Sequence, residues 1–120
     1  MNKLKINLAK IEEVLKKVGY SDKVIEAFRN KFARVFLQRV GEEIHQDLTQ
    51  EQKEKLDKLV TNEKTTFKDL ADYLKKLGFE TKIKQITQKT FEEMIKEILK
   101  KMAVLATDEQ YKILKQTLFS

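Results

Sequence analysis

The sequence has no cysteine, no proline and no tryptophan, and only 3 of its 120 residues are glycine. Without cysteine there is no disulfide framework, no thiolate nucleophile and no cysteine-based zinc or iron–sulfur site. Without proline, little in the chain interrupts a helix, and the many lysines and glutamates favour helices. These absences exclude a secreted disulfide scaffold and predict an all-α protein.

Long apolar runs are also missing. From Met1 to Lys10 lysines alternate with apolar residues, unlike the continuous apolar stretch of a signal peptide. No other stretch approaches the roughly 18 to 20 apolar residues that a membrane span requires. We therefore expect a cytoplasmic, soluble protein with no membrane partner.

The charge is basic but evenly spread. The net charge is +6, with 13 basic and 10 acidic residues before position 61 and 12 basic and 9 acidic residues after it, so each half carries +3. No single segment holds the surplus, which weakens any argument from charge alone.

The chain contains an internal repeat. Leu-Lys-Lys-Val-Gly-Tyr at residues 15–20 returns as Leu-Lys-Lys-Leu-Gly-Phe at residues 74–79. A second match relates Thr49, Gln52 and Leu56 to Thr107, Gln110 and Leu114. A period near 60 residues predicts two copies of one small helical unit.

Apolar residues at helical spacing predict six helices, arranged short, long and short in each half. Gly19 and Gly78 are expected to end the first and fourth helices as Schellman motifs, and Gly41 is expected to mark a close helix crossing. The first helix is expected from about Leu4 or Leu8 to Val18, and the second from Asp22, after an N-cap at Ser21, to Asp47. The third, fourth and sixth helices are expected to start after the caps Thr49, Thr66 and Thr107. The fifth helix is expected from Lys82 to Ala106. The apolar stripes of the two long helices include Val24 and Leu105.

The predicted fold is all-α: two tandem pseudo-symmetric short-long-short units, about residues 1–60 and 61–120, that form one compact helical bundle in a single domain of residues 1–120. At 120 residues the chain is long enough to bury such a core. The predicted core is Leu15, Phe28, Phe32, Phe36, Val40, Ile44, Leu74, Ile83, Ile86, Ile95, Ile98 and Met102.

Few residues suggest chemistry. His45, the only histidine, follows Glu42 at the Glu-x-x-His spacing of di-iron bundles, but the second half has Ala103 at the matching position. Only a homodimer that donates one pair per chain would complete that site, so a surface histidine is favoured. No phosphate loop, nucleophile elbow or zinc motif occurs. We expect no enzyme: no catalytic, cofactor-binding or metal-binding residues and no small-molecule substrate.

The lysines of the second long helix support an alternative function. Lys82, Lys89, Lys96 and Lys100 would contact nucleic acid phosphates without sequence preference, in keeping with a pI near 9.4. No aromatic residue is interleaved with them as a base-stacking platform.

Two resemblances follow from these patterns. The duplicated short-long-short helices resemble the histone fold, and two units in tandem resemble a histone pseudodimer, which implies DNA wrapping. Histone-like proteins carry basic residues in the loop after the long helix, whereas residues 47–51 and 106–109 are acidic here. Residues 36–40, the break at Leu48 and Thr49, and residues 50–56 are similar to a family of short helical bacterial proteins of unknown function, over about residues 20–98.

The sequence most strongly predicts a protein-interaction or assembly module that binds a protein partner or forms a homodimer. The apolar stripes of both long helices are wider than about 100°, which is more apolar surface than one neighbouring helix covers. Met94 and Met102 lie in register with isoleucines and are therefore expected to fill the core before they would line a partner groove.

Overall fold

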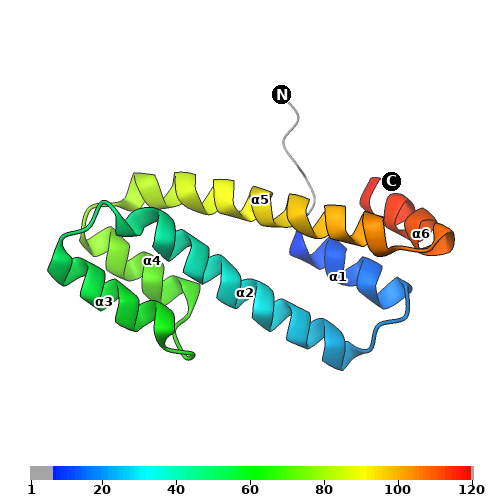
Figure 1. The fold of residues 1–120 in the computed structure, drawn as a ribbon, viewed down its shortest axis with the longest axis horizontal. Helices are drawn as coiled ribbons and strands as arrows, with labels where there is room; N and C mark the ends of the chain where they lie inside the picture. Colours follow the sequence, from blue (N-terminus) through cyan, green and yellow to red (C-terminus); the bar gives the residue numbers. More distant parts are fainter. Residues whose placement is uncertain (1–6, 120) are drawn as a thin grey trace. The chain divides into compact units, whose positions relative to one another are not determined.

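A computed structural model describes residues 7–119, and this part of the chain forms six α-helices with no strand (Figure 1). The all-α class and the order of short, long and short helices are confirmed. The helices are α1 Leu8–Lys17, α2 Asp22–His45, α3 Gln50–Thr61, α4 Phe67–Lys76, α5 Glu80–Leu105 and α6 Asp108–Phe119. The start of α1 is therefore Leu8, while Leu4 lies outside the described residues. The helix α5 begins at Glu80, before the predicted Lys82.

Both predicted Schellman motifs are present. Gly19 has a φ of 103° and Gly78 a φ of 88°, the left-handed conformation that glycine adopts without steric cost. The amide of Tyr20 donates to the carbonyl of Leu15 at 3.0 Å, and the amide of Phe79 donates to that of Leu74 at 3.1 Å. These bonds satisfy the last carbonyls of α1 and α4 and direct the chain into the long helices.

The predicted N-caps at Ser21, Thr49, Thr66 and Thr107 are also confirmed. Each of three capping boxes pairs a threonine with the residue three positions later: Thr49 with Gln52, Thr66 with Asp69, and Thr107 with Gln110. The hydroxyl of Ser21 accepts from the amide of Val24 at 3.3 Å. The hydrogen bonds from Thr66 lower the pKa of Asp69, so this cap stabilises the folded state at neutral pH and weakens as the pH falls through the lowered value.

The contacts divide the chain into two compact units. Unit 1 contains the chain up to Asn30 and from Glu92 onward, and unit 2 contains Lys31–Phe91. In unit 1 α1 packs against α6, and in unit 2 α3 packs against α4. Each unit thus combines helices from both halves of the sequence, and its bounds differ from those of the repeat. That residues 1–120 form a single domain stays a prediction.

Unit 2 has a core supplied by four helices. A smaller aromatic cluster lies in the same unit, where the ring of Phe91 meets those of Phe32 and Phe36 edge-on at 5.8 and 6.2 Å between centroids. The ring of Phe36 lies 5.2 Å from that of Phe67. The main core cluster is Leu37, Val40, Ile44, Leu48, Leu56, Leu70, Leu74, Ile83 and Ile86.

Gly41 marks the predicted close approach within unit 2. It is buried in α2, and a Cβ atom added there would lie 2.9 Å from Cγ1 of Val60 on α3. That separation is shorter than a van der Waals contact, and the β-branched Val60 has little rotamer freedom with which to move away. The absence of a side chain at Gly41 therefore lets α2 and α3 approach closely.

Unit 1 buries a separate set of apolar side chains. Polar contacts also join its helices. Nζ of Lys17 on α1 lies 3.3 Å from the buried hydroxyl of Thr117 on α6, and Arg29 on α2 forms an ion pair with Glu12 on α1. The buried apolar residues of unit 1 are Ile11, Val14, Ile25, Met94, Ile95, Leu114 and Leu118.

The predicted core is partly confirmed. The residues found buried are Phe32, Val40, Ile44, Leu74, Ile83, Ile86 and Ile95, together with the core-filling Met94. The prediction is wrong in part for Leu15, Phe28, Phe36, Ile98 and Met102, which are only half-buried. All of these except Phe36 belong to unit 1. Helical spacing identifies an apolar face but not how completely a neighbouring helix covers it, and the coverage is less complete in unit 1.

Candidate interaction surfaces

The large apolar side chains that are exposed between residues 7 and 118 all belong to unit 1. Leu105 and Val104 are 81% and 76% exposed, and Tyr20, Val24 and Tyr111 are 41–51% exposed. We refer to these five residues as the exposed apolar set. Unit 2 has no counterpart among its described residues, although both units have a helical core of similar composition.

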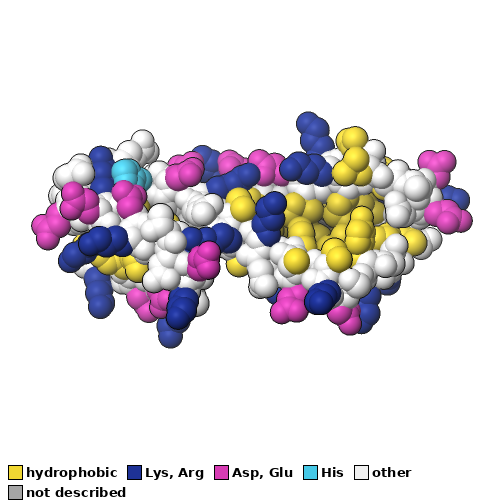
Figure 2. Space-filling view, turned by 60° about the horizontal axis from the view of Figure 1, so that its bottom comes forward, with side chains coloured by type: hydrophobic (Ala, Val, Ile, Leu, Met, Phe, Trp, Pro, Cys, Tyr) yellow, Lys and Arg dark blue, Asp and Glu magenta, His cyan; other side chains and the backbone are white. Residues whose placement is uncertain are grey.

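The members of this set lie at helix ends. Tyr20 lies between α1 and α2, Val24 in the first turn of α2, Val104 and Leu105 in the last turn of α5, and Tyr111 near the start of α6. Figure 2 shows apolar side chains gathered in a hollow over the part of unit 1 formed by α1 and the beginning of α2. Apolar surface in unit 1 is therefore accessible as well as incompletely covered.

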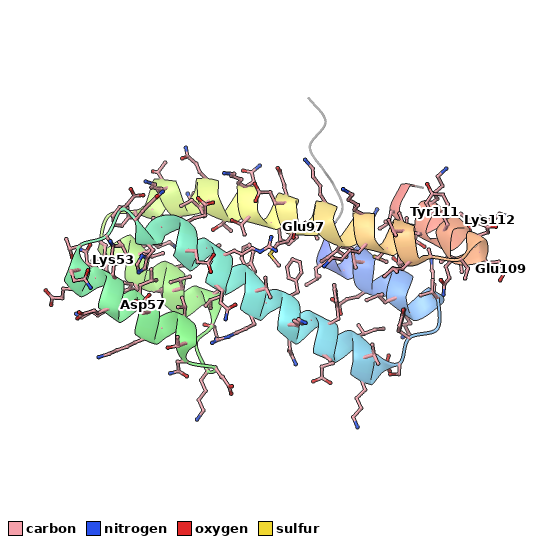
Figure 3. All side chains as sticks on the ribbon, viewed as in Figure 1. Lys53, Asp57, Glu97, Glu109, Tyr111 and Lys112 are labelled. Atoms are coloured by element: carbon pink, nitrogen blue, oxygen red, sulfur yellow. The ribbon has the colours of Figure 1, made fainter. Side chains whose placement is uncertain are left out.

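Tyr111 lies among charged side chains on α6. Glu109 precedes it by two residues and Lys112 follows it directly (Figure 3). Nζ of Lys115 lies 5.3 Å from the centre of the Tyr111 ring, within the range of a cation–π interaction. One part of the ring is thus engaged within α6, while 41% of the residue remains exposed.

The repeat allows a direct comparison of the two units. Tyr20 and Val24 of unit 1 correspond to Phe79 and Ile83 of unit 2. Phe79 packs against the core cluster of unit 2, and Ile83 is only 5% exposed, whereas Tyr20 and Val24 are 51% and 49% exposed. The same local motif is therefore covered in unit 2 and open in unit 1.

The four lysines predicted to contact nucleic acid are all exposed on α5. Steps of seven, seven and four residues place Lys82, Lys89, Lys96 and Lys100 on one face of the helix, away from the buried Met94 and Ile95. Lys82 forms an ion pair with Asp47, in the loop before α3. Lys82 and Lys89 belong to unit 2, while Lys96 and Lys100 belong to unit 1.

His45 takes part in a surface contact. Its Nε2 lies 3.3 Å from Oδ1 of Asp57 on α3, and 38% of its side chain is exposed. Figure 3 labels Asp57 on α3, one turn after Lys53. Across residues 7–119 there is no group of three or more histidine, cysteine, aspartate or glutamate side chains that could hold a metal ion.

The adjacent carboxylates of α1 also have separate partners. Glu12 accepts from Arg29, which raises the pKa of Arg29, while Glu13 lies 3.3 Å from Nζ of Lys17. Neighbouring helical residues point about 100° apart, so the two carboxylates do not face one substrate.

No protein-family model, curated protein or solved structure matches this chain. The resemblances to the histone fold and to the family of short helical bacterial proteins therefore stay predictions. Between residues 7 and 119, none of the helices combines the length and the apolar character needed to cross a lipid bilayer.

Sequence reasoning did not single out the exposed apolar set. It assigned Val24 and Leu105 to the apolar stripes of the long helices, and the structure corrects this because both are exposed. One feature of the sequence does indicate exposure at the end of α5. Val104 and Leu105 are adjacent in a helix, and two adjacent residues cannot both face the centre of one core.

Proposed function

We propose that this protein is a non-enzymatic protein-interaction or assembly module, and that the exposed apolar set of unit 1 is its binding surface. The observation that carries the proposal is the confinement of all exposed large apolar side chains of the described residues to one unit. Scattered apolar side chains are normal on a protein surface, but apolar residues concentrated in one region are typical of interaction sites.

A pseudo-symmetric origin for the two units supports this proposal. If the halves 1–60 and 61–120 are tandem copies in one bundle, α1 corresponds to α4, α2 to α5, and α3 to α6. The contact of α1 with α6 then corresponds to the contact of α4 with α3, and both contacts are present. The two units would be equivalent, so the difference in exposure between them needs a separate cause, and binding at unit 1 supplies one.

The proposal predicts that an apolar dye such as anilinonaphthalene sulfonate binds the folded protein through the exposed apolar set. The double variant Val104→Lys with Leu105→Lys is expected to lose most of the dye fluorescence without loss of helicity, because lysine is favourable near a helix C-terminus. Circular dichroism and dye titration measure the two properties.

The matched control is Gln46→Lys, which adds a lysine just after α2, close to the counterpart of Val104 in the other half of the repeat. It is expected to bind the dye as the wild type does. If the folded wild type binds no dye, or if Gln46→Lys loses as much fluorescence as the double variant, the exposed apolar set is not the accessible surface.

A second candidate function is nonspecific nucleic-acid binding by a histone-like pseudodimer. The observation that favours it is the placement of four exposed lysines on one face of α5, and these four would make the phosphate contacts. Each neutralised phosphate on duplex DNA contributes about 0.9 to the slope of log affinity against log salt. Four contacts would weaken binding by about 100-fold between roughly 50 and 200 mM salt.

A fluorescence titration of labelled duplex DNA at these two salt concentrations tests this candidate. Replacing Lys89, Lys96 and Lys100 by glutamine would reduce the slope by about 3, whereas the same change at Lys55, Lys58 and Lys68 would leave it unchanged. Absence of binding at the lower salt concentration, or an equal effect of both triple variants, rejects the lysine face as the binding site.

A further inference from the structure

We propose that the partner bound by the exposed apolar set is a second copy of this chain. The inference rests on the proposed function of that surface and adds the identity of its occupant. A two-fold interface brings the same surface of both copies together, so the surface must be complementary to itself.

The charges around the exposed apolar set meet that requirement. Within three positions of a member along the chain, the charged residues number four of each sign, and all of them are exposed. The acidic residues are Asp22, Glu26, Asp108 and Glu109, and the basic residues are Lys17, Lys23, Lys101 and Lys112. Lys115, whose ammonium group lies over the Tyr111 ring, adds a fifth basic residue. The surroundings of the set are therefore close to neutral, although the chain as a whole carries +6.

This near balance of charge favours a second copy over a strongly charged partner. An acidic or basic partner would be selected by a surface of opposite sign, because charge complementarity steers association and suppresses wrong partners. Nucleic acid would likewise require a net basic surface. A surface with both signs in nearly equal numbers has opposite charges available when it meets itself in a two-fold arrangement.

The composition of the set also suits an interface between copies. Tyrosine is enriched among residues that dominate binding energy, and Tyr20 and Tyr111 supply two. Val104 and Leu105 are the most exposed large apolar residues of the set and can add aliphatic contacts to those of the two tyrosine rings. Since a few residues carry most of the energy of an interface, charging two of them should be enough to separate the copies.

Sedimentation of the full chain over roughly 1 µM to 1 mM, a span that brackets weak to moderate affinity, tests the proposal. The wild type is expected to approach the mass of a dimer at the upper end. The double variant Val104→Lys with Leu105→Lys is expected to raise the dissociation constant by about 30-fold or more, and Gln46→Lys is expected to leave it unchanged. If the double variant loses its helicity, Tyr111→Ser provides an independent test of the same surface.

Several results would overturn the proposal. One is a wild type that stays monomeric over the whole concentration range. Another is a dimer that is weakened neither by Val104→Lys with Leu105→Lys nor by Tyr111→Ser. A third is a loss of the dimer in Gln46→Lys that equals the loss in the double variant. A monomeric wild type that still binds the dye through the exposed apolar set would reject the second copy and leave the interaction surface in place. A monomer that binds no dye would reject both.

Discussion

Leu74→Ala is expected to lower the free energy of unfolding by about 3 kcal/mol, whereas Leu105→Ala should change it by less than about 0.5 kcal/mol. Leu74 is fully buried in the core cluster of unit 2, and truncation there removes apolar contacts and leaves a cavity. Leu105 is 81% exposed, so its truncation leaves no cavity. Urea denaturation followed by circular dichroism measures both changes.

The counterpart of Leu74 in the repeat is an internal control. Leu15 is likewise followed by two lysines and, two residues further on, by glycine, but it is only half-buried, so Leu15→Ala is expected to cost less than Leu74→Ala. Equal losses for Leu15 and Leu74 would contradict the difference in coverage between the units. Leu105→Ala should be measured at about 1 µM protein. At higher concentrations a second copy that covers Leu105 would increase the loss of unfolding free energy caused by the substitution.

Phe32→Ala is expected to lower the free energy of unfolding by about 4 kcal/mol. The residue is 7% exposed, and its ring lies 5.8 Å from the ring of Phe91 in an edge-to-face contact and 6.3 Å from the ring of Phe36. Alanine would remove both ring contacts as well as the buried apolar area. Urea denaturation again provides the measurement.

Phe32→Leu is the matched control, because leucine keeps much of the apolar volume and loses only the ring geometry. Its cost is expected to be about 1 to 1.5 kcal/mol. A cost of Phe32→Ala below that of Phe32→Leu, or below about 1 kcal/mol, would show that the aromatic cluster does not stabilise unit 2.

Much of the local structure could be predicted because its causes lie within a few residues. A threonine and a glutamine three positions apart cap a helix through their own hydrogen bonds, as at Thr49 and Thr107. Gly19 and Gly78 end their helices because glycine adopts a positive φ. Signals of this kind mark where one helix ends and the next begins, and for that reason the helix order was predicted correctly.

The candidate site could not be predicted in the same way. Val24 and Leu105 have the spacing of core residues, and helical periodicity alone does not distinguish a covered apolar face from an open one. The lysines of α5 were predictable because solvent exposure opposite an apolar stripe follows from the helix itself. Whether those lysines bind phosphate depends on a partner, and this stays a prediction.

By itself, the sequence determined the helical class, the capped helix ends and the repeat, because hydrogen bonds and backbone preferences over a few residues are sufficient for each of them. The tertiary structure decided which helices pack together: α1 with α6, and α3 with α4. It also decided that Phe79 and Ile83 are covered while Tyr20 and Val24 remain exposed. These pairs share one local motif, so only contacts between residues distant in the chain can make their environments differ.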